Sequence, residues 1–390
     1  MPEFGPITCA GCGLLCDDVL VDAADEAVRL TPDCDLGAQW FSERLLRPAG
    51  APSATIDGKP VDVGSALTRA AELLRGARRP VLHGFEYATV EDARAAVALA
   101  DRLGAVIATD DGEWAGAPAV PLRGASTATL GEIRDRARVV VIWREDPEST
   151  HPRLLERLGI GGGVERTVVV VDDSDTATAG RAEVRLGWPP GRDLEALTTL
   201  HALQRGLTVQ AGELELPLSG LLKRLRAVPH VAFVYGAGLT AGAGGQRRAL
   251  ALHELVRALC HERHAVTLEL PGAPGTRSAD DVLAWQSGYG GNVDFASGHP
   301  ELVTATQPLD DVDVTLLVEP GSAGAAEIAL GSLAAGPGVE VWIRTAAAGV
   351  DGGGTAHRLD GVPLALQAPL PGEAPSAAAV LTRLLAEVER

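Results

Sequence analysis

The chain of 390 residues is poor in aromatic side chains, which make up 4% of it, and it contains a single methionine. It also lacks any apolar run near the ~20 residues that a membrane-spanning helix needs. Its first residues, Met-Pro-Glu-Phe-Gly-Pro, lack the basic and then apolar segments of a secretory signal. We therefore expect a cytoplasmic protein that does not enter a membrane.

Positive charge is also scarce. The chain has 52 acidic and 34 basic residues, which gives a formal net charge of −18 at pH 7. The Lys and Arg residues form no stripe that would reverse this charge locally. Such a surface repels a phosphate backbone, so nucleic-acid binding is not expected.

The chain is nevertheless rich in material for a packed core, with 46% hydrophobic residues and 46 glycines. Short apolar runs alternate with amphipathic segments, a pattern typical of mostly parallel sheets covered on both faces. The predicted strands are 80–84, 105–109, 139–143, 167–172, 230–235, 265–270, 314–319 and 339–344. The predicted helices include 63–76, 90–103, 129–137, 152–158, 193–206 and 246–261. Two further short strands are expected around the Asp-Gly turn of 54–62.

We therefore predict the α/β class with three domains. The first is a small, loop-rich N-terminal domain at residues 1–50, which contains four of the five cysteines and is therefore expected to be an iron–sulfur domain. Two doubly wound, mostly parallel α/β domains follow at residues 51–187 and 188–390. The second α/β domain includes a glycine-rich turn, 236–245, between a predicted strand and a predicted helix. Such a turn either holds a nucleotide phosphate or serves close packing.

Four of the five cysteines lie within the first 34 residues, with the spacing C-x2-C-x3-C-x17-C. They are Cys9, Cys12, Cys16 and Cys34. A cubane cluster needs four thiolates that converge from a compact loop with nearby backbone N–H groups, and this spacing suits it. A zinc ion is one alternative, although zinc sites more often pair C-x2-C with a second such knuckle. Four unligated thiols are the other, and Cys260 is expected to be a small buried side chain.

The cysteine segment is part of a longer resemblance. Residues 9–19, Cys-Ala-Gly-Cys-Gly-Leu-Leu-Cys-Asp-Asp-Val, and then Trp40-Phe41 resemble the start of the B subunit of formylmethanofuran dehydrogenase, a molybdopterin oxidoreductase. Further segments that follow its pattern are 129–137, Trp143, Asp146-Pro147, 151–153, 284–289, 293–295 and 298–300. Each of these later segments is a weak signal by itself, but together they are specific.

The resemblance implies a tungsten- or molybdenum-pterin centre beside a [4Fe-4S] cluster, interconverting CO2 and a formyl group on methanofuran. In active members a Cys or selenocysteine in the loop after the second strand binds the metal. Here that loop, 109–118, contains no cysteine, and Glu113 or Trp114 stands at the position. Where the family has a glycine after Trp143, this chain has Arg144. We expect a degenerate site without pterin; the alternatives are a metal ligated by Glu113 and a pyrophosphate bound by Arg144.

The pattern most resembles the pterin-less B subunit of bacterial formyltransferase/hydrolase complexes, which hydrolyse the formyl group to formate without redox chemistry. This resemblance implies a scaffold whose partners are the hydrolase or A subunit, the C subunit and a formyltransferase. It also implies a surface for a methanofuran-like carrier. The alternatives are a catalytic molybdenum or tungsten subunit with an atypical ligand, and a free-standing electron carrier.

Overall fold

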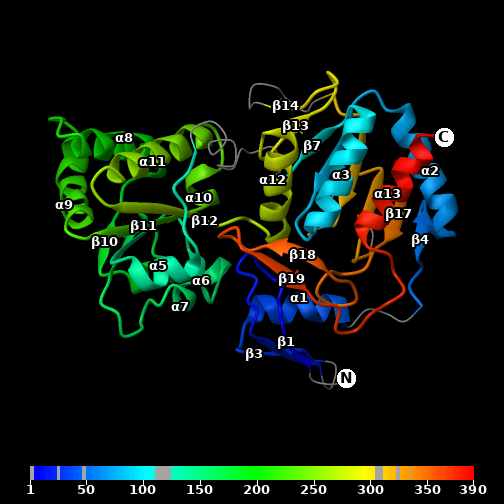
Figure 1. The fold of residues 1–390 in the computed structure, drawn as a ribbon, viewed down its shortest axis with the longest axis horizontal. Coiled ribbons are helices and arrows are strands. Elements are labelled where there is room, and N and C mark those ends of the chain that lie inside the picture. Colours follow the sequence, from blue (N-terminus) through cyan, green and yellow to red (C-terminus); the bar gives the residue numbers. More distant parts are fainter. Residues whose placement is uncertain are drawn as a thin grey trace. The chain divides into compact units, whose positions relative to one another are not determined.

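The computed structural model describes residues 4–23, 27–45, 50–109, 124–303, 311–321, 326–334 and 336–390. These residues form two compact units (Figure 1). Unit 1 contains the described residues up to 109, together with 272–358 and 362–390. Unit 2 contains 124–271 and 359–361. The chain therefore leaves unit 1 after the first strands of its large sheet, builds unit 2, and returns.

Unit 1 combines two sheets and a hairpin with five helices among its described residues. Its helices are α1 (Asp35–Leu45), α2 (Val63–Gly76), α3 (Val90–Leu103), α12 (Pro274–Ser287) and α13 (Ala377–Val388). Its first strands are β1 (Phe4–Ile7), β2 (Val19–Asp22), β3 (Arg29–Thr31), β4 (Ala54–Ile56), β5 (Lys59–Pro60), β6 (Pro80–Gly84) and β7 (Val106–Ala108). Its later strands are β13 (Val293–Asp294), β14 (Glu301–Leu302), β15 (Val314–Val318), β16 (Ile328–Gly331), β17 (Val341–Arg344), β18 (Gly354–His357) and β19 (Pro363–Leu366).

The large sheet of unit 1 has the order β14-β13-β7-β6-β15-β16-β17-β4-β5, and its centre from β7 to β17 is parallel. Successive side chains of a strand point to opposite faces. Leu82, Leu316 and Val318 accordingly join the main core with α2, α3, α12 and α13. Val81 and Leu317 belong to smaller apolar clusters on the other face. The four helices thus cover one face, whereas double winding predicts helices on both.

The N-terminal part of unit 1 is a small layer with its own core. Strands β1, β2 and β3 form an antiparallel sheet, and α1 follows. Its apolar side chains pack with Ala347, Val350, Ala356 and Leu366 from the C-terminal part of the chain. The layer is therefore held by residues about three hundred positions away, which the expectation of a separate domain at 1–50 did not include.

Unit 2 is a five-stranded parallel sheet with helices on both faces (Figure 1). Its strands are β8 (Val139–Trp143), β9 (Thr167–Val171), β10 (Val184–Leu186), β11 (His230–Tyr235) and β12 (His264–Glu269). Its α-helices are α5 (Leu130–Arg136), α6 (Pro147–Thr150), α7 (Leu154–Arg157), α8 (Asp193–Gln204), α9 (Glu215–Arg226), α10 (Ala237–Thr240) and α11 (Gly245–Leu259). Three short 3-10 helices are η1 (Thr178–Arg181), η2 (Pro190–Arg192) and η3 (Gly212–Leu214).

The strand order of unit 2, β10-β9-β8-β11-β12, explains its sequence pattern. Strands β8 and β11 are central, and all of their residues are buried, so they read as continuous apolar runs. The first residues beyond the carboxyl ends of β8, β9, β11 and β12 are Arg144, Asp172, Gly236 and Leu270, in that order. The loops that follow parallel strands meet at one edge, where open α/β sheets hold ligands.

The α/β class and the mostly parallel sheets are confirmed. Helices 63–76 and 90–103 have the predicted bounds, and Gly104 ends the second in the left-handed conformation. The predicted boundary between residues 187 and 188 differs from the structure, because it falls inside unit 2. Strands β8 and β9 share a sheet with β11 and β12 there, although the prediction placed them in different domains. Local periodicity identifies strands, but pairing depends on hydrogen bonds between distant segments.

Among the residues that the structure describes, every helix is too short or too polar to cross a lipid bilayer.

Candidate functional site

The four N-terminal cysteines lie in one small region of unit 1. The backbone N–H of Cys9 donates to the carbonyl oxygen of Cys16 over 2.8 Å, which folds the first three cysteines into a tight loop. Leu15, with a φ of 41°, makes the reversal within that loop. Cys34 lies just before helix α1, and the N–H of Ala38 donates to its carbonyl oxygen. The structure therefore brings the distant cysteine to the three close ones.

Gly37 makes this arrangement sterically possible. A Cβ atom added to Gly37 would lie 3.1 Å from the Cys9 sulfur, 3.8 Å from the Cys34 sulfur and 2.5 Å from Leu30 Cδ1. A Cβ added to Gly11 would lie 3.0 Å from the Cα of Gly37. Two glycine backbones thus approach each other between the cysteines, and any side chain at Gly37 would enter the space beside two sulfurs.

Burial determines the protonation of two of the thiols. It raises the pKa of Cys12 to about 12 and that of Cys9 further, and repulsion from the other cysteines adds to both shifts. Backbone N–H groups oppose them, including that of Gly11, 3.4 Å from the Cys9 sulfur. Thiolates at these positions would need compensating positive charge. N–H groups directed at sulfur are also the environment that an iron–sulfur cluster requires.

Within the described part of the chain, no three or more His, Cys, Asp or Glu side chains are placed to bind one metal ion. A tetrahedral zinc site gathers all four sulfurs around a single ion, whereas a cubane cluster gives each of its irons a separate thiolate. Which of the two the four thiols hold stays a prediction.

Cys260 does not contribute to this region. It follows helix α11 in unit 2 and is exposed, so the expectation that it is buried was wrong. Its thiol contacts the carbonyl oxygen of Ala265 over 3.2 Å at the surface. A cysteine at a helix end faces solvent when the apolar side of that helix ends before it.

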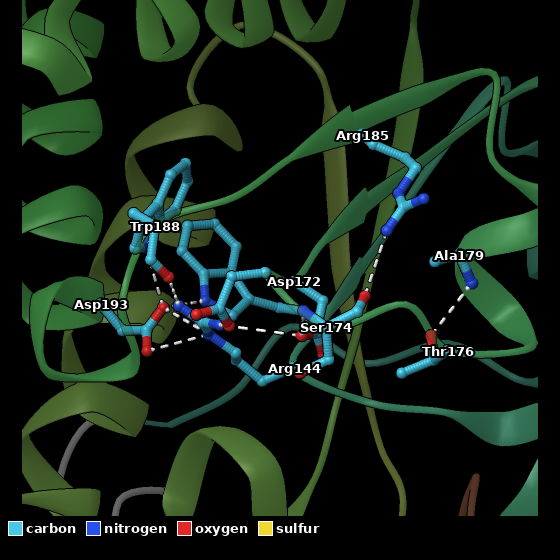
Figure 2. A network of polar contacts seen from close by, with 10 residues as sticks. Arg144, Asp172, Ser174, Thr176, Ala179, Arg185, Trp188 and Asp193 are labelled. Atoms are coloured by element: carbon cyan, nitrogen blue, oxygen red, sulfur yellow. Dashed lines mark hydrogen bonds and ion pairs between the residues drawn. The ribbon is translucent and has the colours of Figure 1, made fainter.

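Arg144 lies at the carboxyl edge of the unit 2 sheet and is buried, in a network that Figure 2 shows. Its Nε lies 3.1 Å from both carboxylate oxygens of Asp193, and its Nη1 lies 2.5 Å from Asp173 Oδ1. Its Nη2 donates to the carbonyl oxygen of Trp188. Asp193 also accepts from the indole N–H groups of Trp143 and Trp188, over 3.0 and 3.1 Å.

All three guanidinium nitrogens of Arg144 are thus bonded within unit 2. A buried arginine held in this way is part of the fold and is not available to a phosphate. The residue has a φ of 55°, a region where glycine is least strained, and glycine is the residue that the resemblance implies at this position. The region does not fit a bound pyrophosphate at Arg144.

The glycine-rich turn after β11 is occupied by the chain itself. Gly238 packs against the Arg144 backbone so closely that a Cβ would overlap the carbonyl oxygen. The Gly238 N–H donates to Glu145 Oε1 over 2.8 Å, and a Cβ at Gly236 would lie 2.7 Å from the same oxygen. The amide that a phosphate would use therefore binds Glu145, and Gly236 and Gly238 serve close packing.

Glu145 is unusual for a loop carboxyl. Burial raises its pKa to about 7, and the nearby carboxylates of Asp172, Asp146 and Glu269 contribute to the rise, while the Gly238 N–H opposes it. Like charges gather here because three strands end at this edge, each followed or closed by an acidic residue. Glu145 is therefore partly protonated near neutral pH.

The two other residues expected at the degenerate centre, Glu113 and Trp114, lie outside the described residues. The described chain stops at Thr109, just beyond β7. Its N–H donates to Asn292 Oδ1 over 3.2 Å and its hydroxyl to Asp280 Oδ1 over 2.7 Å. These bonds fix where the loop begins.

No protein-family model matches the chain. It is 27% identical to the B subunit of the tungsten-containing formylmethanofuran dehydrogenase 2 of Methanocaldococcus jannaschii, over 93% of this chain and 92% of that protein. The corresponding subunit of Methanococcus maripaludis is 26% identical and matches over 94% of both chains. The B subunit of the formyltransferase/hydrolase complex Fhc of Methylorubrum extorquens is 28% identical, over 64% of this chain and 68% of that one.

The fold agrees with these sequence matches. A chain in the crystal structure of the formyltransferase/hydrolase complex FhcABCD from Methylorubrum extorquens, solved with methylofuran, superposes with a TM-score of 0.69. It is 26% identical, and the match covers 86% of this chain and 98% of that one. The chain is a distant homologue of both kinds of B subunit. The resemblance inferred from the cysteine segment is therefore confirmed over most of this B-subunit homologue.

Sequence reasoning missed several residues that shape these regions. The partners of Arg144 were one group, although a usable signal existed: Trp188 is followed by two prolines and Asp193, which mark the start of α8. Gly37, three residues after Cys34, was another. Its proximity to two sulfurs depends on the turn before α1, which the sequence alone does not specify.

Proposed function

We propose that this B-subunit homologue is a scaffold protein of a one-carbon formyl-transfer complex, with a [4Fe-4S] cluster and without a functional pterin centre. The observation that carries the proposal is the pairing of two features. Four cysteines converge in unit 1, and the Arg144 network fills the sheet edge of unit 2. The four cysteines suit a cluster. The Arg144 network leaves no guanidinium nitrogen of Arg144 for the pyrophosphate of a pterin.

Cys9, Cys12, Cys16 and Cys34 would hold the cluster, one thiolate for each iron. When bound, the cluster would supply a one-electron centre. The residues around it would exclude water, because the cysteine loop packs into the apolar core of the N-terminal layer. Gly11 would donate its N–H to the Cys9 sulfur, and Gly37 would keep space free beside Cys9 and Cys34.

Loss of the pterin is supported by two independent features of the chain. The loop 109–118 has no cysteine to bind a pterin metal. Arg144 replaces a glycine and is fixed by Asp173, Asp193 and Trp188 in the position that the family keeps open. Removing both a metal ligand and the space beside it is difficult to compensate.

The partners proposed for this chain are the hydrolase or A subunit, the C subunit and a formyltransferase, with a methanofuran-like compound as carrier. The related structure supports them, since it is that of the complex FhcABCD with methylofuran. Within such an assembly, a protein without its own catalytic centre acts by positioning its neighbours. The net charge of −18 favours partners with basic surfaces.

A catalytic role is the second candidate, and one observation favours it. The two relatives that match over more than nine-tenths of this chain belong to tungsten-containing enzymes. In that case Glu113 or another group in the loop 109–118 would bind molybdenum or tungsten.

Elemental analysis of the protein, purified anaerobically with its partner subunits, separates the candidates. About four irons per chain without molybdenum or tungsten supports the scaffold with a cluster. Stoichiometric molybdenum or tungsten overturns the scaffold role and supports the catalytic one. Zinc in place of iron overturns the cluster assignment.

A further inference from the structure

A surface groove in unit 1 is lined by residues that belong to neither the cysteine region nor the Arg144 network. It has a volume of about 550 Å³ and runs along helix α3, with contributions from α13 and from the ends of α12 and β13. Its floor is apolar, since it includes Val97 and Phe295. Two residues of α3 that line it, Ala95 and Ala98, have short side chains that leave the groove open along this helix. A groove of this kind accepts a helix with an apolar face.

Trp285 lies at the end of α12, next to Gln286 of the groove wall, and its side chain is 60% exposed. The Arg94 guanidinium lies over its ring, 5.6 Å from the ring centre. The cation orients the indole without covering it. Exposed tryptophan and arginine at the edge of an apolar depression are typical of the residues that contribute most to protein–protein binding.

The charges along the groove are available to a partner. Among the described residues, Arg94 and Asp101 make no hydrogen bond or ion pair, although both are exposed and line the groove. They are seven residues apart on α3, so they lie on one face, about 10 Å apart along the helix axis. Glu91, which also lines the groove one turn before Arg94, accepts from the N–H and the hydroxyl of Thr355. The groove thus has a positive group near its aromatic end, a carboxylate that is already hydrogen-bonded beside it, and an unbonded negative group two turns away.

We propose that this groove binds a helix of a partner subunit, with an acidic side chain against Arg94 and a basic one, two turns along, against Asp101. Apolar side chains between them contact Val97 and Phe295. A second copy of this chain is a poor occupant, because its net charge is also −18 and pairing about a two-fold axis would place concave surface against concave surface. The inference rests on the proposed function, since it assumes an assembly.

The test uses the full chain, co-expressed with the same organism's homologues of the A, C and D subunits of the related complex. The variants are Trp285→Ala and Asp101→Lys. Matched controls lie in unit 2, where Leu216 is 83% exposed and the Glu213 side chain 95%. They are Leu216→Ala and Glu213→Lys. We expect each groove variant to weaken assembly about tenfold or more, the loss typical of a buried interface anchor, and each control to leave it unchanged.

Unchanged thermal unfolding of the groove variants will show that they fold, as their exposure predicts. If both groove variants assemble as well as the wild type does, the inference is overturned and the proposed function still stands. A wild-type chain that joins none of the three other subunits overturns the proposed function itself. If the wild-type chain forms a homodimer and the Trp285→Ala substitution dissociates it, the occupant of the groove is a second copy of the chain, which overturns the choice of a different protein. Cross-linking to the groove identifies the partner helix. If a basic-to-acidic substitution in that helix restores assembly of the Asp101→Lys variant, the inference is supported.

Discussion

The Arg144 Nε lies 3.1 Å from both carboxylate oxygens of Asp193, and both side chains are almost fully buried. Two indole N–H groups also donate to Asp193. A guanidinium and a carboxylate removed from water in this way stabilise a structure only when every partner stays in place. This pair therefore decides whether the carboxyl edge of unit 2 is a ligand site or part of the core.

Replacing Arg144 with alanine should destabilise unit 2 by about 3–5 kcal/mol, because it leaves the Asp193 charge buried without a counterion. Amide hydrogen exchange in β8 measures this loss, since it reports opening of the unit rather than of the whole chain. Arg185→Ala is the matched control. Arg185 pairs with Asp175 at the surface, and its loss should cost no more than about 1 kcal/mol. Equal protection in the two variants would contradict the structural role of Arg144.

Cys12→Ser should abolish most iron incorporation on anaerobic reconstitution, because a cubane cluster loses one of its four thiolates. Cys260→Ser should retain the wild-type iron content, since that cysteine is exposed in unit 2. Iron content per chain and the visible absorbance of the cluster are the measurements. Iron that survives Cys12→Ser but not Cys260→Ser would place the metal elsewhere.

Gly37→Ala should lower iron incorporation while all four cysteines remain. The added Cβ would lie 2.5 Å from Leu30 Cδ1 and 3.1 Å from the Cys9 sulfur, so α1 must shift away from the cysteine loop. Gly220→Ala, in helix α9, is the control because no atom of the described residues lies within 4 Å of its added Cβ. That change should stabilise the helix by up to about 1 kcal/mol. A Gly37→Ala protein that binds iron as well as wild type would refute the tight fit.

Glu145 should make unit 2 less stable as the pH rises. Its pKa is about 7 in the folded protein against an ordinary value of 4.5, so the folded state holds the proton more tightly. The stability that this proton contributes is complete below about pH 4.5 and is lost as the pH rises through about 7. Glu145→Gln removes the titration and retains an oxygen that accepts from the Gly238 N–H.

Urea unfolding of wild type and Glu145→Gln at about pH 5 and about pH 8 checks this, because the difference between the two proteins cancels other titrating groups. The advantage of the glutamine variant should grow with pH. A difference that is the same at both pH values would contradict the assignment.

The sequence anticipated the elements better than their arrangement. Helix α3 was predicted to its bounds because Thr89 caps its start, apolar residues repeat along one face and Gly104 ends it. Helices α9 and α12 were missed because glycine, proline and polar residues interrupt their apolar positions. Helix α13 was missed although Ser376 caps its start and apolar residues repeat along one face. Strands β8 and β15 were both predicted, yet nothing local indicates that they belong to different sheets.

By itself the sequence determined the α/β class, the cysteine spacing, the missing cysteine in the loop 109–118 and the resemblance to B subunits, because each depends on residue type and local period. Only the tertiary structure decided that unit 2 is inserted into unit 1, and that Cys34 and Gly37 lie beside Cys9. It also decided that Arg144 is held by Asp193 rather than open to a ligand. These outcomes depend on contacts between distant segments, whose partners no local pattern encodes.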